Sequence, residues 1–193
     1  ADSMANIGLG DTQQVAESLA TSPDAFRAGL VFAFLSAFFF LMAAWGLYVL
    51  LRPVNRDLAL LFLLLNAVGV AVQCASQLHL VSAMEFAVGE PALVAIEVYR
   101  TGFVTAQLFY GTWLFPLGYL VYKSGFLPRV LGVLLILDGV AELIWFFQAL
   151  LLPDHPEIRT PGTFVSLLAE VGLMLWLLIV GVPASEAPDP TQQ

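Results

Sequence analysis

Acidic and amide side chains interrupt the most hydrophobic stretches of this sequence. Asp138, Glu142 and Glu170 lie inside long apolar runs, and Gln107 lies inside another. One ionised side chain at the centre of a bilayer costs about 2.5 to 3.5 kcal/mol on insertion scales. Carboxyls in such places handle protons, hold a ligand, or join helices through hydrogen bonds. These residues are therefore the first candidates for chemistry.

The spacing of two of these acids makes proton handling one of the open interpretations. Asp138 and Glu142 are four residues apart, which places them on one face of a helix. Two ionised carboxylates one helical turn apart repel each other in a low dielectric, so we expect at least one of them to be protonated. Together with Glu170, they form the candidate proton-handling group.

A ligand pocket is the other chemical interpretation. Arg100 shares a helix face with Gln107, and its long side chain can reach toward Glu142 or Glu170. At 1.5 Å per residue, the amide and the two acids lie at similar depths in their helices. A structural role is favoured over both interpretations, since buried carboxyls and amides also hold membrane helices together through interhelical hydrogen bonds worth about 0.6 kcal/mol on average. The predicted pocket, open to the outside, is lined by Arg100, Gln107, Glu142, Glu170, Tyr99 and Trp145.

The sequence lacks the residue patterns for nucleic-acid binding, zinc binding and nucleophilic catalysis. The chain has 7 Lys and Arg against 15 Asp and Glu, which argues against a nucleic-acid partner. Its two histidines, His79 and His155, and its one cysteine, Cys74, do not have the spacing of a zinc site. Serines such as Ser166 have no intramembrane histidine as a base. We expect no catalytic residue, metal or cofactor, and the sequence leans against an enzyme.

The elements that carry these residues are predicted to be membrane-spanning helices. The chain is 60% hydrophobic and 11% charged, whereas soluble proteins are roughly a quarter charged. A span needs about 20 apolar residues, and five runs meet that requirement. We therefore predict an all-α integral membrane protein with a five-helix transmembrane domain at 27–182. The spans are 27–51, 57–82, 98–122, 128–152 and 162–182.

Segments outside this domain have a different character. An outer segment, 1–26, contains Thr12–Thr21, where Val15 and Leu19 are four residues apart among polar residues. This spacing predicts a short amphipathic helix on the membrane surface. The tail 183–193 is acidic and Pro-rich, and we predict that it is disordered and cytoplasmic.

Basic residues predict the orientation. Arg52 and Arg56 share one loop, and Lys123 and Arg129 share another on the same side. Short cytoplasmic loops retain Lys and Arg. We expect the N-terminus outside, the C-terminus inside, and a multi-pass location in the bacterial inner membrane. Glycines inside the spans predict close helix contacts at Gly46, Gly69, Gly118 and Gly172.

Two motifs resemble those of a known family. Arg52–Asn55 (RPVN) and above all Gly118–Arg129 (GYLVYKSGFLPR), with an ending that contains Glu170 and Trp176, resemble the bacterial membrane family called domain of unknown function 4386. Members of that family usually carry one more hydrophobic helix ahead of the first span. This sequence lacks that helix, so the resemblance implies that the helix was cleaved or omitted. With the helix restored, the chain would have six spans and its N-terminus would begin inside. The resemblance implies a fold but no activity.

Three functions remain open at this point. The first is a non-catalytic accessory subunit of a membrane complex, or a binder of a lipid or small apolar ligand. The alternative is a small proton-linked transporter that uses Asp138, Glu142 and Glu170. The third is an intramembrane enzyme, which lacks an evident nucleophile. The expected partners are membrane lipids, other membrane subunits or a second copy of the chain.

Overall fold

The computed structural model describes residues 12–86 and 89–181, and in those ranges its regular structure is entirely helical. The predicted all-α fold is confirmed. Residues 1–11 and the predicted tail 183–193 lie outside the described residues. The helices are α2 (Thr12–Thr21), α3 (Pro23–Leu51), α4 (Arg56–Glu85), α5 (Glu90–Lys123), α6 (Arg129–Leu151), the 3₁₀ helix η1 (Pro156–Arg159) and α7 (Thr160–Ile179).

Four helices are long and apolar enough to cross a membrane. They are α3, α4, α6, and α7 together with η1. α5 is 34 residues long, which exceeds the length of a span. It is not among the four because Gln107, Tyr110 and Pro116 interrupt its apolar run. A crossing by α5 and the orientation of the chain therefore remain predictions.

Local sequence signals set the helix ends. Pro23 occupies the first position of α3, where its missing N–H is not needed. Asn55 caps α4, because the backbone N–H of Leu58 donates to Asn55 Oδ1 at 3.0 Å. Gly125 separates α5 from α6 with a φ of +79°, which favours glycine. α5 begins eight residues before the predicted span, with Pro91 in its first turn.

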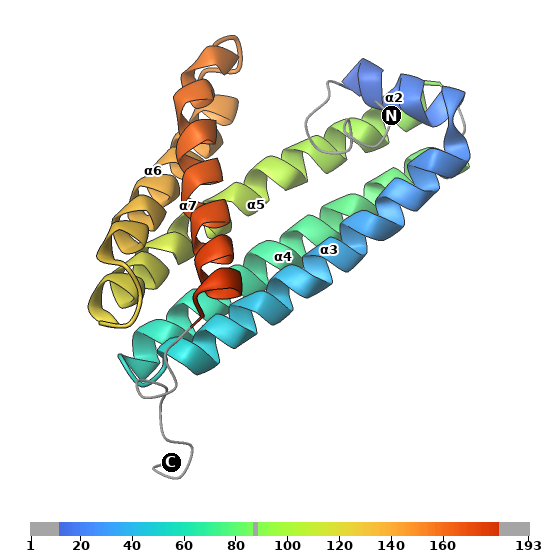
Figure 1. Ribbon diagram of the computed structural model, residues 1–193. Coiled ribbons are helices and arrows are strands. Elements are labelled where there is room, and N and C mark those ends of the chain that lie inside the picture. Colours follow the sequence, from blue (N-terminus) through green and yellow to red (C-terminus); the bar gives the residue numbers. More distant parts are fainter. Residues whose placement is uncertain (1–11, 87–88, 182–193) are drawn as a thin grey trace. The chain divides into compact units, whose positions relative to one another are not determined.

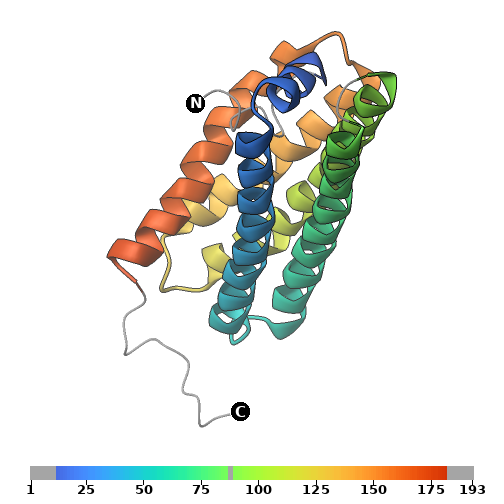
Figure 2. The same cartoon turned by 90° about the vertical axis from the view of Figure 1, so that its right-hand side faces the viewer.

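The chain divides into two compact units, and α3, α4 and α5 each contribute to both. The first unit comprises 1–42 and 68–106, and the second comprises 43–67 and 107–193. In the first unit, α2 (dark blue in Figure 2) buries Val15 and Leu19 in a core shared with α3, α4 and α5. The short helix predicted at Thr12–Thr21 is thus present.

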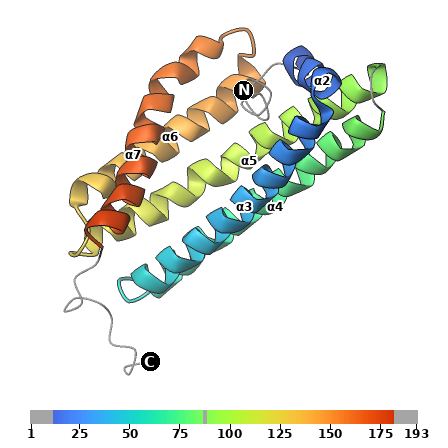
Figure 3. The ribbon, with the colours of Figure 1, turned by 45° about the vertical axis from the view of Figure 1, so that its right-hand side comes forward.

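In the second unit, glycines bring α5 and α6 into backbone contact. A Cβ on Gly118 would lie 2.7 Å from the carbonyl oxygen of Gly132, and one on Gly139 would lie 2.8 Å from that of Gly111. The two pairs are seven residues apart on both helices. The close contact predicted at Gly118 is confirmed, whereas the one predicted at Gly46 is wrong, because a Cβ there would have no neighbour within 4 Å. α7 then packs beside α6 as the second arm of a hairpin (Figures 1 and 3).

Gly118→Ala is expected to destabilise the protein. The added methyl would meet the Gly132 carbonyl at 2.7 Å, so α5 and α6 must separate. Overpacking of this kind costs about 1 to 3 kcal/mol. The matched control is Gly46→Ala on α3, where a Cβ has no neighbour within 4 Å.

Gly46→Ala is expected to stabilise the protein by about 0.5 to 1 kcal/mol, because alanine is the better helix former. Reversible denaturation in mixed micelles measures both variants. Equal effects of the two substitutions would show that α5 and α6 do not depend on this contact.

Candidate functional site

One serine on α7 links two of the predicted acids on α6. The Ser166 hydroxyl makes a short hydrogen bond with Asp138 Oδ1 and lies 3.4 Å from Glu142 Oε1. It also lies 3.2 Å from the carbonyl oxygen of Gly162, one turn earlier in the same helix. Asp138 is fully buried. We call Asp138, Glu142, Ser166 and Glu170 the acid cluster.

Helical spacing builds the acid cluster from both sides. Asp138 and Glu142 are one turn apart on α6, and Ser166 and Glu170 are one turn apart on α7. Gly162 allows the two helices to approach beside the cluster, since a Cβ there would lie 2.9 Å from the Cβ of Ala141. The antiparallel hairpin therefore places two rows of polar side chains face to face.

The acid cluster is electrostatically unbalanced. Glu170 is exposed, yet it lies close enough to Asp138 and Glu142 to interact with both charges. Among the described residues, no salt bridge joins any of these acids to a basic side chain. The second oxygens, Asp138 Oδ2 and Glu142 Oε2, are buried and have no hydrogen-bond partner within 12–86 and 89–181. The cluster therefore concentrates acceptors, and the described part of the chain supplies no counter-charge to it.

The acid cluster is made of groups that exchange protons and hydrogen bonds. A serine hydroxyl carries one proton, and an ionised carboxylate only accepts hydrogen bonds. In the part of the chain that the structure describes, no group of three or more His, Cys, Asp or Glu side chains is placed to hold a metal ion. The chemistry available to these groups is proton uptake and release.

Arg100 has partners other than those predicted. Its Nη1 donates to Thr12 Oγ1 at 2.9 Å and lies 3.5 Å from Glu97 Oε2. The Thr12 hydroxyl in turn donates to Glu97 Oε2 at 2.6 Å. These three residues join α2 to α5 within the first unit, whereas Glu142 and Glu170 belong to the second.

The remaining residues of the predicted pocket lie in separate surroundings. Tyr99 is buried in the core of the first unit, with its ring centroid 6.1 Å from that of Phe103. Trp145 packs under the Arg159 guanidinium at 5.5 Å. Gln107 is buried in α5. Of the predicted site residues, the structure brings together Asp138, Glu142 and Glu170.

Ser166 is the residue of the acid cluster that sequence reasoning missed. It was considered only as a nucleophile, a role for which it has no histidine base. Its position four residues before Glu170 repeats the spacing of Asp138 and Glu142. That shared period was the available signal for two facing polar rows.

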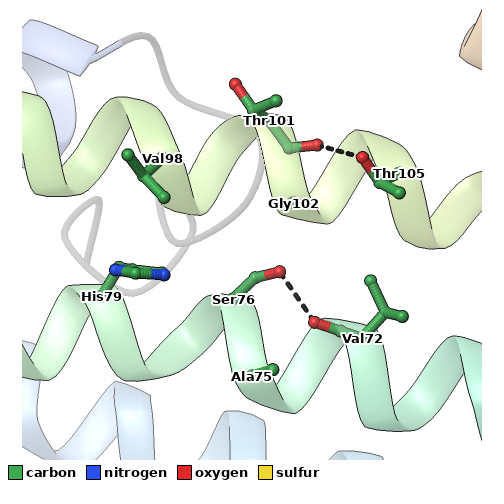
Figure 4. A pocket seen from close by; sticks show the side chains of 8 residues that line it. All are labelled: Val72, Ala75, Ser76, His79, Val98, Thr101, Gly102 and Thr105. Carbon is green, nitrogen blue, oxygen red and sulfur yellow. Dashed lines mark hydrogen bonds between the residues drawn. The ribbon is translucent and has the colours of Figure 1, made fainter.

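A groove of about 440 Å³ lies between α4 and α5 in the first unit (Figure 4). It is open on one side, and His79 faces Val98 at one of its ends. This groove was not predicted from the sequence. Its lining residues are Val72, Ala75, Ser76 and His79 from α4, and Val98, Thr101, Gly102 and Thr105 from α5.

The helices define a multi-pass membrane protein. The chain belongs to the family described as Domain of unknown function (DUF4386), whose model matches residues 3–181, which confirms the resemblance. It is also 28% identical to an uncharacterized protein of Archaeoglobus fulgidus over 148 residues, 74% of this chain and 77% of the relative. No solved structure matches the chain. A bacterial origin remains a prediction.

Arg100→Met is expected to loosen α2. The substitution keeps an unbranched side chain but removes the donor to Thr12, so α2 loses one of its polar links to α5 and keeps the Thr12–Glu97 hydrogen bond and its apolar contacts. Loss of one such hydrogen bond corresponds to roughly fivefold faster amide exchange in Thr12–Thr21. Hydrogen–deuterium exchange with mass spectrometry measures this. The control, Arg27→Met, breaks an exposed pair with Asp24 and should leave the exchange of α2 unchanged.

Ser166→Ala is expected to destabilise the protein by about 1 to 3 kcal/mol, because it leaves acid oxygens without a donor. Adding Asp138→Leu removes the other partner, so the double variant should lose less than the sum of the single losses. A coupling of about 0.5 to 3 kcal/mol is expected from the double-mutant cycle. Ser36→Ala, at an exposed position on α3, is the control. Additive losses would show that Ser166 and Asp138 do not stabilise each other.

Proposed function

We propose that this membrane protein is a small proton-linked carrier in which the acid cluster holds the exchangeable proton. The observation that carries the proposal is the Ser166 hydroxyl, shared between Asp138 and Glu142, with no basic residue of the described ranges bonded to either acid. We thus prefer the small proton-linked transporter, which was the alternative predicted from the sequence, to the accessory subunit.

The hydrogen-bond count supports a bound proton. Ser166 has one proton for three nearby acceptors, namely Asp138 Oδ1, Glu142 Oε1 and the Gly162 carbonyl. The Gly162 carbonyl already accepts the backbone N–H of Ser166 within the helix. If both carboxyls were ionised, one of the two carboxylate oxygens would therefore lack a donor. A proton on one carboxyl supplies the missing donor, because a protonated carboxyl can donate to the serine oxygen. One bound proton therefore relieves the shortage of donors and the repulsion together.

The position of Glu170 supports exchange of that proton. Asp138 is fully buried, Glu142 is half-buried and Glu170 is exposed, so the three acids lead from the interior of the hairpin toward its surface. Acidic chains of this kind relay protons in pumps and transporters. A structural hydrogen bond alone needs only one acid opposite Ser166. The additional acids, which repel one another, fit a proton path better.

Infrared difference spectroscopy tests the proposal. When the pH of the reconstituted protein is raised, the C=O band of a buried protonated carboxyl should disappear, and it should return when the pH is lowered. Asp138→Asn, Glu142→Gln and Glu170→Gln should each reduce or shift this band, because each change removes one member of a coupled group. Glu17→Gln, at an exposed position on α2, is the control.

Proton flux provides the second measurement. In vesicles with an internal pH dye and an imposed membrane potential, the wild-type protein should speed proton entry relative to empty vesicles. Glu142→Gln should lower that rate at least tenfold, whereas Glu17→Gln should not change it. If protonation of the cluster never changes over the pH range in which the protein stays folded, the proposal is wrong. An accessory subunit or lipid binder would then be the better function.

A further inference from the structure

We infer that the groove between α4 and α5 binds one membrane phospholipid, with an acyl chain along the groove and a phosphate oxygen at His79. The inference is independent of the proposed function, because the groove lies in the first unit and the acid cluster in the second. Figure 4 shows the eight lining residues on the two facing helices.

The walls of the groove are apolar despite their hydroxyl groups. Ser76 donates to the carbonyl of Val72 at 2.7 Å, and Thr105 donates to that of Thr101 at 2.8 Å. Thr101 likewise donates to the carbonyl of Glu97 at 3.1 Å. Because each hydroxyl donates its proton within its own helix, a molecule in the groove need not supply a hydrogen-bond acceptor. A hydrocarbon chain satisfies such walls without a hydrogen bond.

Small residues form the floor of the groove. Gly102 lies against Ser76, and a Cβ on Gly102 would be 2.8 Å from the Cβ of Ser76. Ala75 lies one residue from this contact, while Val72 and Val98 stand near the two ends (Figure 4). The hollow therefore exists because the side chains at the helix crossing are short. A larger residue at Ala75 would occupy it.

His79 supplies the polar end of the site. Its imidazole is exposed and has no hydrogen-bond partner among the described residues. It lies six residues before the end of α4, about 9 Å along the helix axis, which is near headgroup level if α4 spans the bilayer. Glu97, the residue before Val98, is already bonded to Thr12 and Arg100. The imidazole N–H can thus donate a hydrogen bond to a phosphate oxygen.

The dimensions of the groove favour a lipid over a second copy of the chain. Its lining spans Val72 to His79 and Val98 to Thr105, about 10 Å along each helix axis. A stable interface between two proteins buries at least about 1,200 Å², which requires contact over a greater length. An acyl chain, in contrast, lies along the membrane normal and needs only a narrow channel.

Preference for this lipid must come mainly from His79. An acyl chain gains little hydrophobic free energy when it moves from the bilayer into an apolar groove, because lipid tails are as apolar as the walls. A hydrogen bond to a charged phosphate is the additional interaction, and it corresponds to roughly tenfold tighter binding or more. The shape of the groove sets the position of the acyl chain, and the hydrogen bond to the imidazole slows dissociation of the lipid.

Native mass spectrometry of the full chain tests the site after reconstitution in vesicles of dioleoyl phosphatidylglycerol. The wild-type protein should retain one phospholipid. Ala75→Leu, which fills the floor, should lower the retained fraction at least tenfold. Ala71→Leu, the same change one turn away at an exposed position outside the groove, should retain the lipid. His79→Phe should lower retention roughly tenfold.

Three results would overturn the inference. The first is a wild-type protein that retains no lipid under conditions in which it stays folded by circular dichroism. The second is equal lipid retention by the Ala75→Leu and Ala71→Leu variants, which would place the lipid elsewhere. The third is a dimer that Ala75→Leu dissociates, because the occupant would then be a helix of a second copy.

Discussion

A polar group that leaves water for hydrocarbon must find its partner inside the protein, and this constraint organises the whole chain. The helices satisfy their own backbones, and most hydroxyls inside them bond to a carbonyl one turn earlier, as Ser76, Thr105 and Thr112 do. These side chains need no hydrogen-bond partner from another helix. The polar residues that do need one, above all the acids of α6, decide which helices must pack against each other.

Glycine makes those contacts possible at close range. On one side of α6, the pairs Gly111–Gly139 and Gly118–Gly132 bring it against α5, and on the other side Gly162 brings it against α7. Gly139 directly follows Asp138, so the residue that touches α5 and the acid that bonds to Ser166 are neighbours in the sequence. Close packing and the acid cluster therefore depend on the same turn of α6.

The sequence predicted the helices well because their signals are local. Proline, asparagine and apolar run length fixed most ends to within a few residues, and the four-residue spacing identified the acid pair. Arg100 shows where such reasoning fails, since position along a helix does not say which helix lies beside it. Arg100 instead bonds to Thr12, 88 positions away in the sequence. Ser166 was missed because a mid-helix serine usually bonds to its own helix, as Ser166 also does with Gly162.

The two candidate sites differ in what their hydroxyl groups do. In the groove, Ser76, Thr101 and Thr105 donate to carbonyls of their own helices, so the walls behave as hydrocarbon and can only sort molecules by shape. In the acid cluster, Ser166 faces Asp138 across a helix interface, and its one hydroxyl proton lies near acceptor oxygens of both Asp138 and Glu142. The same residue type thus leaves one surface apolar and gives the other a hydrogen-bond donor shared between two acids. The deciding factor is whether the facing helix carries an acid, which is a property of the packing and cannot be read from either helix alone.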